Sequence, residues 1–341
     1  MNPVHPGKNQ RFIFQWHINE ICNLKCLHCY QENATAGNIS VQEMQKIFSQ
    51  IQKFIPEYKI HINITGGEPF LHPEMEYMLK TLENLSSVSY GILSNGTLID
   101  RSFAKTLKKY NVSFVQVSLD GVHKKHDHIR GEGSFGRAVS GIKNLGKENI
   151  PVQISFTANT LNYKYFSEVA SLGRKLGVQK VWTDRVIPCG SAADSDMSLN
   201  PEKTKEFMEI LTRESEKNGR TKIDSHRALQ FLLGTGNVYK CAAAKNLLTI
   251  MPGGDVLPCR RLPIRIGNVY ENTLMEILHN SEFSRKMVSG KPVSGCETCF
   301  YEKTCNGGLK CLAYAVKGDA WKSDPGCWLA SDNKYFTKGL S

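Results

Sequence analysis

The chain has 341 residues, of which 40% are hydrophobic and 22% are charged, and both values are ordinary for a globular protein. No run approaches the roughly 18 uninterrupted apolar residues of a membrane span, and the N-terminus lacks the pattern of a signal peptide. The net charge of +11 favours acidic partners, but the basic residues are scattered and form no stripe typical of nucleic-acid binding. We therefore predict a cytoplasmic protein with one large and one smaller domain, and with no membrane or nucleic-acid partner.

The chain from residue 11 to residue 217 alternates between strand-like and helix-like patterns. The predicted strands are 12–18, 60–65, 88–93, 112–119, 152–157 and 179–183. The predicted helices are 40–54, 72–85, 102–110, 136–147, 163–176 and one that opens at 198–201 and ends near 217. The first helix carries a capping box, Ser40 with Glu43. Six strand–helix units predict parallel strands with helices outside, as a partial (β/α)6 barrel.

The chain divides by composition into four parts. Residues 1–10 are predicted to be a loose lead-in, and 11–217 to be the barrel. Residues 218–239 read as a bridge. From 240 to 341 the composition shifts to Cys, Gly and Pro, which predicts a second domain organised by metal.

The eleven cysteines are distributed unevenly, with three at 22–29, seven at 241–327 and Cys189 apart from both groups. Thiols stay reduced in the cytosol, so disulfides do not explain this number of cysteines. A short loop can direct three thiolates to one point, and a cubane cluster held by three cysteines leaves one iron open. His28 could instead complete a zinc site with the three cysteines, so zinc is the alternative.

The spacing CxxxCxxC after a first strand, at Cys22, Cys26 and Cys29, resembles the signature of radical S-adenosylmethionine (SAM) enzymes. The resemblance implies a [4Fe–4S] cluster on these cysteines whose open iron binds SAM. It further implies that one electron cleaves SAM to a 5′-deoxyadenosyl radical, which abstracts a hydrogen atom from the substrate. A reducing partner such as flavodoxin or ferredoxin would supply that electron.

Polar and glycine-rich motifs follow the later strands, where parallel folds build their sites. By resemblance, the Gly66–Gly67–Glu68 turn recognises the amino group of SAM, and its glycines allow close backbone approach. Ser118 and Arg130 match a SAM-binding serine and arginine of related enzymes, although a surface role for Arg130 is an alternative. The predicted cofactor-binding residues are His28, Gly66, Gly67, Glu68, Ser94, Asn95, Ser118, Asp120, Arg130, Asn159 and Val186.

The later cysteines resemble the SPASM domain, which carries two auxiliary [4Fe–4S] clusters. The resemblance assigns Cys296, Cys299, Cys305 and Cys327 to one cluster, and Cys241, Cys259 and Cys311 to the other. Five residues, rather than the usual three, separate Cys305 from Cys311, but two of them are glycines that make the turn adaptable. Zinc sites or a [2Fe–2S] site are alternatives. Cys189 is either a cluster ligand, a substrate contact or an inert thiol.

The leading hypothesis is a radical SAM/SPASM maturase that modifies a ribosomally made peptide by a thioether or carbon–carbon cross-link or by epimerisation. The positive charge would favour a peptide with an acidic leader, and a separate leader-binding protein is a predicted partner. Tetrapyrrole side-chain decarboxylation is an alternative, because 313–319 and 324–327 resemble that branch too. Sulfatase maturation is another, although Arg260 stands where those enzymes place an acidic residue. The non-catalytic alternative is a zinc-binding scaffold.

Overall fold

The computed structural model describes residues 10–31, 37–85, 87–224, 226–236 and 238–330. All but the last residue of the predicted lead-in, and the predicted second domain beyond residue 330, lie outside the described residues. Among the described residues, no helix has the length and apolar character needed to cross a membrane.

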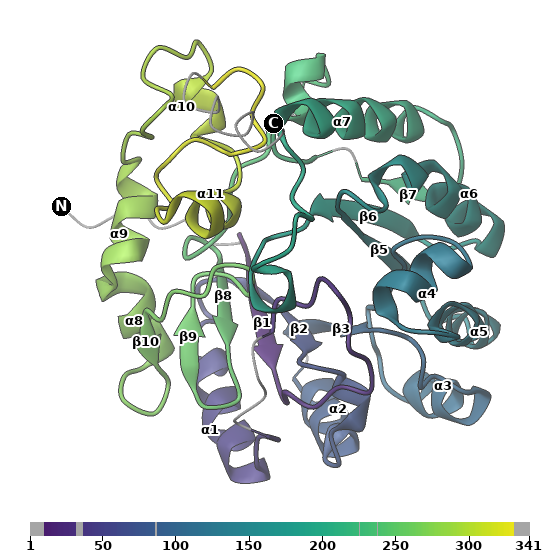
Figure 1. Cartoon of the computed structure of the whole chain (residues 1–341). Helices are drawn as coiled ribbons and strands as arrows, with labels where there is room; N and C mark the ends of the chain where they lie inside the picture. Colours follow the sequence, from purple (N-terminus) through teal and green to yellow (C-terminus); the bar gives the residue numbers. More distant parts are fainter. Residues whose placement is uncertain (1–9, 32–36, 86, 225, 237, 331–341) are drawn as a thin grey trace.

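One curved sheet runs through the molecule (Figure 1), with the strand order β10-β9-β8-β1-β2-β3-β4-β5-β6-β7. The strands are β1 (Arg11–His17), β2 (Lys59–Thr65), β3 (Val88–Ser94), β4 (Phe114–Ser118), β5 (Val152–Ala158), β6 (Lys180–Arg185), β7 (Lys222–Ile223), β8 (Leu247–Ile250), β9 (Asp255–Leu257) and β10 (Gly267–Asn268). All pairs from β8 to β7 in this order are parallel, whereas β9 pairs antiparallel with β8 and with β10. The parallel run β1–β6 confirms the predicted partial barrel.

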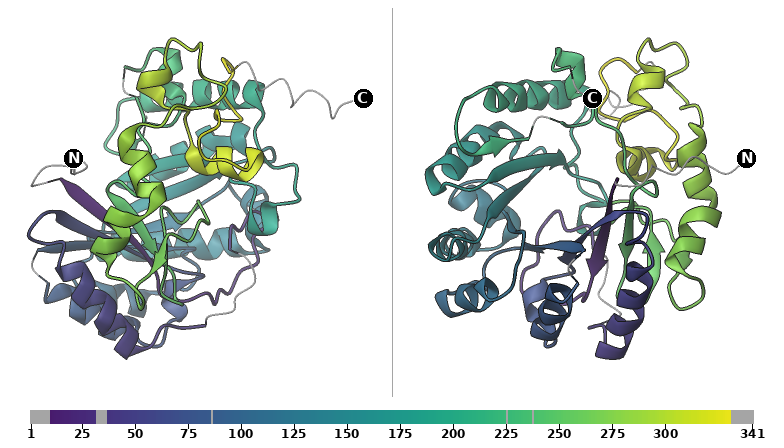
Figure 2. Two further views of the ribbon diagram at one scale, coloured as in Figure 1. Left: turned by 90° about the vertical axis from the view of Figure 1, so that its left-hand side faces the viewer. Right: turned by 180° about the vertical axis from the view of Figure 1, so that it is seen from behind.

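Helices cover the outer face of the sheet, and Figure 2 shows the same arrangement from two further directions. The α-helices are α1 (Val41–Gln52), α2 (Met75–Glu83), α3 (Arg101–Lys108), α4 (Lys124–Arg130), α5 (Ser134–Lys147), α6 (Phe166–Leu176), α7 (Pro201–Ser215), α8 (Leu274–Asn280), α9 (Glu282–Ser289), α10 (Glu302–Cys305) and α11 (Lys310–Lys317). Short 3₁₀ turns are η1 (Pro69–Leu71), η2 (Tyr163–Tyr165), η3 (Gly190–Ala192) and η4 (Gln230–Leu233). Helices α8 and α9 lie beside β8–β10 (green in Figure 1).

The core forms where β1 meets α1. Phe12, Phe14 and Trp16 alternate along β1 and are fully buried. The Phe12 ring lies 5.0 Å from that of Phe54, and the Trp16 ring lies 4.9 Å from that of Phe48. Burial of these aromatic rings fixes α1 against the sheet and orients the loop that leaves β1.

The capping box of α1 is confirmed. The Ser40 hydroxyl accepts a hydrogen bond from the Glu43 backbone N–H at 3.3 Å, and the Glu43 carboxylate accepts one from the Ser40 backbone N–H at 2.8 Å. The next helix differs from its prediction, because α2 begins three residues later than expected. His72 Nδ1 accepts a hydrogen bond from the Glu74 backbone N–H and Nε2 pairs with the Ile39 carbonyl, so 72–74 form a turn.

The N-terminal and C-terminal parts of the chain share this sheet. Strand β8 pairs with β1 over Ile13–Trp16, on the opposite edge from β2. Strand β7, inside the predicted bridge, pairs with β6. The predicted division at residue 240 therefore separates two parts of one continuous sheet, and it stays a prediction as a domain boundary. Strand β6 also extends two residues beyond its predicted end, which brings Asp184 and Arg185 to the rim.

Candidate active site

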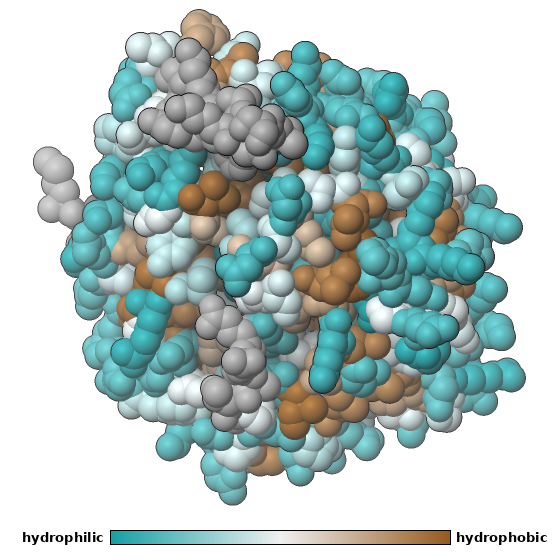
Figure 3. Space-filling model, in the orientation of Figure 1, coloured by the Kyte–Doolittle hydropathy of each residue, from teal (hydrophilic) through white to brown (hydrophobic). Residues whose placement is uncertain are grey.

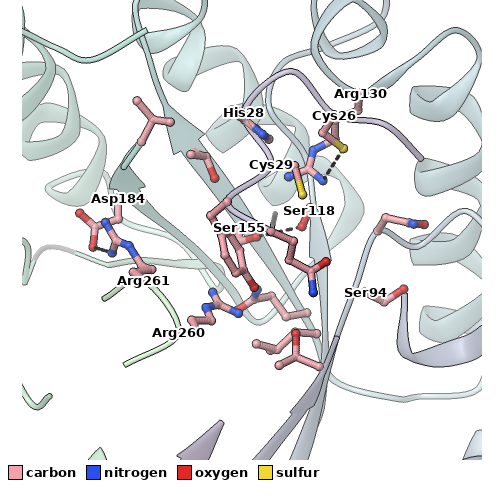
Figure 4. Close-up of a pocket in the computed structure, with 18 of the residues that line it drawn as sticks. Cys26, His28, Cys29, Ser94, Ser118, Arg130, Ser155, Asp184, Arg260 and Arg261 are labelled. Carbon is pink, nitrogen blue, oxygen red and sulfur yellow. Dashed lines mark hydrogen bonds and ion pairs between the residues drawn. The ribbon is translucent and has the colours of Figure 1, made fainter. Parts of the chain in front are cut away.

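A cavity opens at the carboxyl ends of the parallel strands (Figure 4). The cavity and the solvent space at its mouth together amount to about 1070 Å³. Cys22, Cys26 and Cys29, in the loop after β1, all line it. Eight of the eleven predicted cofactor-binding residues also line it, namely His28, Gly66, Gly67, Ser94, Asn95, Ser118, Arg130 and Val186. Motifs that are far apart in the sequence therefore meet in one space, as expected for strand ends in a parallel sheet.

The Asp120 carboxylate, which is fully buried at the end of β4, holds the cysteine loop in position. His28 Nε2 lies 2.7 Å from Asp120 Oδ2, and Arg130 Nε donates to the same oxygen at 2.5 Å. The Thr157 backbone N–H donates to Asp120 Oδ1 at 2.7 Å. Burial alone would raise the pKa of Asp120, but Arg130 and His28 hold that pKa well below its usual range. The ionised carboxylate thus joins the cysteine loop to α4 and β5.

Arg130 links this carboxylate to a thiol. Its Nη1 atom lies 3.8 Å from Cys26 Sγ, and Figure 4 shows the two side chains together beside Cys29. Burial raises the pKa of Cys26 to about 11, although the Arg130 charge acts in the opposite direction. The metal-free thiol therefore keeps its proton at neutral pH, and a bound iron would displace that proton.

The Gly66–Gly67 turn packs against the chain that leads into the cysteine loop. A Cβ atom on Gly67 would lie 2.3 Å from the Ile21 carbonyl oxygen, so only glycine fits there. The Gly67 backbone N–H donates to the Asn19 carbonyl at 3.1 Å, and the Glu68 backbone N–H donates to the Ile21 carbonyl at 2.8 Å. The turn thereby fixes the entry to Cys22.

Glu68 is buried behind the residues that line the cavity and does not line the cavity itself. Its fully buried carboxylate accepts hydrogen bonds from the Ser94 hydroxyl at 2.9 Å and the Asn95 backbone N–H at 2.8 Å. Burial raises the pKa of Glu68 to about 7, although these hydrogen bonds act in the opposite direction. Glu68 joins the ends of β2 and β3, and its contact with a cofactor stays a prediction.

Asn159 also lies behind the wall. It is fully buried, and its Oδ1 atom accepts a hydrogen bond from the Leu161 backbone N–H at 2.9 Å. The adjacent Asn162 donates through Nδ2 to the Asp120 carbonyl at 3.0 Å. These two asparagines shape the turn after β5, and a direct role of Asn159 in cofactor binding stays a prediction.

Several cavity residues were not predicted from the sequence. Gln116 on β4 and Ser155 and Thr157 on β5 line the cavity, and the Ser118 and Ser155 hydroxyl oxygens lie 3.4 Å apart. These polar residues alternate with buried apolar residues along each strand. That period of two is the signal that could have identified them, because alternate residues of a strand face the same side.

Asp184 and Arg185, which are neighbours at the end of β6, form ion pairs with residues in the C-terminal part of the chain. Asp184 pairs with Arg261, and Arg261 Nη2 also donates to the Arg185 carbonyl at 2.9 Å. Arg185 forms a bidentate ion pair with Asp324, with distances of 2.8 Å from Nη1 to Oδ1 and 2.6 Å from Nη2 to Oδ2. Both side chains are buried. The barrel therefore holds both Arg261, two residues after Cys259, and Asp324, three residues before Cys327.

The predicted cluster ligands of the C-terminal part fall into two groups in space. Cys296, Cys299, Cys305 and Cys327 line one small pocket with apolar neighbours such as Phe231 and Leu232. Cys311 lies close enough to Cys259 and Cys241 for their charges to interact. Gly307 and Gly308, with φ of +76° and +70°, turn the chain between the two groups, so the longer spacing is accommodated. The ligand assignments themselves stay predictions.

Cys189 lies in a segment that packs on the exit of the cysteine loop. The Ser191 backbone N–H donates to the Cys29 carbonyl at 2.8 Å. A Cβ atom on Gly190 would lie 2.5 Å from that same carbonyl oxygen. The 189–191 segment thus supports the loop, whereas a role of the Cys189 thiol in metal or substrate binding stays a prediction.

The residues present fit an iron–sulfur cluster with SAM. Three thiols of one loop face a single cavity, which suits the thiolate ligation that such clusters require. The hydroxyl of Ser118, the guanidinium of Arg130 and the Gly66 backbone offer hydrogen bonds for the polar groups of SAM. Apolar residues such as Leu24 and Val186 also line the cavity.

Comparison with known families agrees with this geometry. The profile of the radical SAM superfamily matches residues 16–172, and that of the SPASM iron–sulfur cluster-binding domain matches residues 241–300. An AdoMet-dependent heme synthase of Methanosarcina barkeri is 25% identical, covering 92% of this chain and 95% of that protein. An Fe-coproporphyrin III synthase of the same organism is 27% identical, covering 96% and 90%. Mycofactocin maturase MftC of Mycobacterium tuberculosis is 27% identical, covering 94% and 84%.

Two solved structures share the fold. Streptococcus suis SuiB bound to precursor peptide SuiA superposes with a TM-score of 0.74 at 18% identity, over 92% of this chain and 75% of that chain. Native anSMEcpe with bound AdoMet superposes with a TM-score of 0.75 at 19% identity, over 92% and 93%. At these identities the similarity shows the arrangement of the chain and not the substrate.

Proposed function

Since this chain belongs to the radical SAM enzymes that carry a SPASM domain, we propose that it abstracts a hydrogen atom from a peptide substrate. The cofactors of this family are a SAM-binding [4Fe–4S] cluster, SAM and auxiliary iron–sulfur clusters. When bound, they supply the one-electron cleavage of SAM and the 5′-deoxyadenosyl radical. The chain's own residues hold these groups, orient the substrate and keep water out.

The observation that carries the proposal is the meeting of three thiols, the Asp120–Arg130 pair and the Gly66–Gly67 turn around one cavity. We assign Cys22, Cys26 and Cys29 as the ligands of the SAM-binding cluster. Asp120 orients Arg130, and Arg130 and Ser118 present a cation and a hydroxyl to the carboxylate or ribose of SAM. Ser94 and Asn95 border the same cavity.

The later cysteines are proposed to bind two auxiliary clusters. Cys296, Cys299, Cys305 and Cys327 would hold one completely, and their shared pocket supports this. Cys241, Cys259 and Cys311 would hold the other. We propose that these clusters carry electrons to or from a reducing partner such as flavodoxin or ferredoxin.

A peptide is the leading substrate because the curated relatives include mycofactocin maturase MftC, a maturase by its name. The net charge of +11 supports a peptide with an acidic leader, delivered by electrostatic attraction in the cytoplasm, and a separate leader-binding protein fits the same role. A cross-link or an epimerisation would both begin with the same hydrogen abstraction.

A tetrapyrrole is the second candidate substrate. The M. barkeri relatives named for heme and Fe-coproporphyrin III synthesis align over nearly their whole lengths. In that case a hydrogen atom would be removed from a propionate side chain of the substrate, which would then lose carbon dioxide and pass one electron to an acceptor, leaving a vinyl group.

Anaerobic incubation of the reconstituted enzyme with SAM and dithionite tests the proposal. We expect 5′-deoxyadenosine to form, and to form faster with the true substrate. Candidate precursor peptides would change mass by loss of two hydrogens or by uptake of one solvent deuteron. Fe-coproporphyrin III would instead lose about 46 mass units, one carbon dioxide and two hydrogens, for each propionate converted to a vinyl group. Absence of 5′-deoxyadenosine from iron-loaded enzyme would contradict the proposed function.

A further inference from the structure

Four arginines line the cavity, and three of them are neutralised by a carboxylate. Arg130 pairs with Asp120, Arg185 with Asp324 and Arg261 with Asp184. Arg260 has no ion pair with any described residue. The wall of this cavity therefore carries one uncompensated positive charge within the described part of the chain.

Arg260 is held in place by its backbone and by an aromatic ring. Its backbone N–H donates to Gln15 Oε1 at 3.2 Å, and the same oxygen accepts a hydrogen bond from the Thr249 hydroxyl at 3.0 Å. Its guanidinium carbon lies 5.9 Å from the centre of the Tyr30 ring. Because Gln15 belongs to β1 and Thr249 belongs to β8, these hydrogen bonds fix the Arg260 backbone to the rigid sheet.

The guanidinium is short of hydrogen-bond acceptors. Arg260 Nε is buried and has no partner among the described residues. Its charge acts on a buried neighbour: burial and, to a smaller extent, the Arg260 charge together lower the pKa of His17 to about 3. A buried donor without an acceptor is costly to keep, and a ligand that supplies an oxygen removes that cost.

Arg260 lies apart from Arg130 and from two of the cysteines assigned to the SAM-binding cluster. In Figure 4, Ser118 and Ser155 lie between Arg260 and the group formed by Arg130, Cys26 and Cys29. A molecule that spans the cavity could therefore contact SAM at one end and Arg260 at the other.

We propose that Arg260, backed by the Tyr30 ring, is the subsite for a carboxylate group of the substrate. The inference rests on the proposed function, because it assumes that this cavity takes the substrate. A guanidinium binds a carboxylate through two parallel N–H···O bonds, which fixes direction as well as position. The subsite would hold the reacting carbon toward SAM, and it suits either an acidic peptide side chain or a tetrapyrrole propionate. The face of the molecule shown in Figure 3 mixes hydrophobic patches with a largely hydrophilic surface.

Binding measurements on the anaerobically reconstituted protein with SAM test the subsite. The probes are labelled decaglutamate against decaglutamine, and coproporphyrin III against its tetramethyl ester. We expect wild-type protein to prefer one carboxylate probe over its neutral counterpart, and the preferred pair identifies the source of the carboxylate. Arg260→Gln should lower the affinity for that carboxylate probe by about tenfold or more and leave the affinity for the neutral probe unchanged. Arg260→Lys should retain only part of the affinity, because lysine keeps the positive charge but cannot donate the two parallel hydrogen bonds of a guanidinium.

The matched control is Arg137→Gln, which removes the same charge from an exposed position on α5. It should bind every probe as wild type does. Equal affinity of wild type for charged and neutral probes would overturn the subsite, and so would a weakened SAM affinity of Arg260→Gln with unchanged probe affinity. Failure of the proposed function would appear separately, as wild-type enzyme that loads iron but forms no 5′-deoxyadenosine.

Discussion

The two groups of cysteines at the ends of the chain are built in opposite ways. The cysteine loop supplies Cys22, Cys26 and Cys29 from eight consecutive residues, and Cys22 is exposed to an open cavity. The C-terminal pocket gathers four cysteines from 296–327, and its walls include apolar side chains such as Phe231. The site at the loop is the larger of the two, with about 1070 Å³ of empty space against about 340 Å³ in the C-terminal pocket, so it has room for a ligand beside its three thiols. The larger site suits chemistry on SAM, and the smaller site with four thiols suits a cluster that is fully ligated.

The supports of the two groups differ as well. The cysteine loop is held by the buried carboxylate of Asp120, by the Gly66–Gly67 turn and by the 189–191 segment. The C-terminal groups are attached to the barrel through Asp184 and Arg185, which are neighbours in the sequence. A change at the loop should therefore act on SAM binding, and a change at the C-terminal pocket should act on cluster content without removing the loop.

The largest effect is expected from replacing Cys22, Cys26 and Cys29 together with alanine. With all three sites loaded, iron should fall from about 12 to about 8 per chain, and SAM cleavage should stop because the open cluster is lost. Iron and acid-labile sulfide analysis with an assay for 5′-deoxyadenosine measures both. Cys189→Ala is the matched control and should keep all its iron. Loss of iron in that control would instead make Cys189 a ligand.

The next effect is expected from Cys327→Ala in the C-terminal pocket. Iron should fall by about four per chain, while the cysteine loop still cleaves SAM slowly in the presence of dithionite. The melting temperature should fall, because a bound cluster stabilises the fold that holds it. If iron stayed at the wild-type level, the assignment of the four-cysteine pocket would be wrong.

Asp120→Asn should produce a smaller but clear loss. It keeps the shape of the side chain and removes the charge that pairs with Arg130 and His28, so the free energy of unfolding should fall by about 3 kcal/mol. SAM should bind more weakly as well. Urea unfolding and SAM titration measure the two effects. Glu168→Gln, which breaks an exposed pair with Lys125, should cost about 0.5 kcal/mol or less. Equal losses in the two variants would show that Asp120 has no special role.

The smallest effect is expected from Lys310→Met. Lys310 is buried, its Nζ has no hydrogen-bond partner among the described residues, and its charge interacts with Cys241, Cys296 and Cys305. It therefore lies between the two proposed auxiliary sites. Removing the cation should make electron addition to these clusters harder and lower their reduction potentials by tens of millivolts. A redox titration followed by electron paramagnetic resonance measures the shift. The exposed Lys303→Met should leave the potentials unchanged, and a similar shift there would argue against a specific effect of Lys310.

The features that could be predicted from the sequence are those that depend on the pattern of neighbouring residues. Alternating apolar residues identified β1–β6, and fixed spacing identified the cysteine loop, because neither needs knowledge of distant residues. The helix α4 was missed, since it is short and has no side-chain cap. The contact between His28 and the Asp120 carboxylate was also missed, because the two residues lie 92 positions apart in the sequence. The pair Arg185–Asp324 spans 139 residues, and no local signal links its members.

Arg260 shows the same limit. Its place directly after Cys259 is plain in the sequence, but the absence of an ion pair between its side chain and any described residue is a property of the folded cavity. The neighbouring Arg261 has the same chemistry and is neutralised by Asp184. Only the assembled strand ends distinguish the two.

The parallel pairing of β8 with β1 has a consequence for synthesis of the chain on the ribosome. Strand β1 is made first, but its partner on one side arrives some 235 residues later, the separation between Arg11 and Asn246. At about 5–20 residues per second, that interval lasts on the order of ten seconds or more. During this time β1 has an open edge, and open edges attract wrong partners. We therefore expect the cysteine loop to remain accessible to iron–sulfur delivery proteins until β8 has been made, and the nascent chain to depend on chaperones in the same interval.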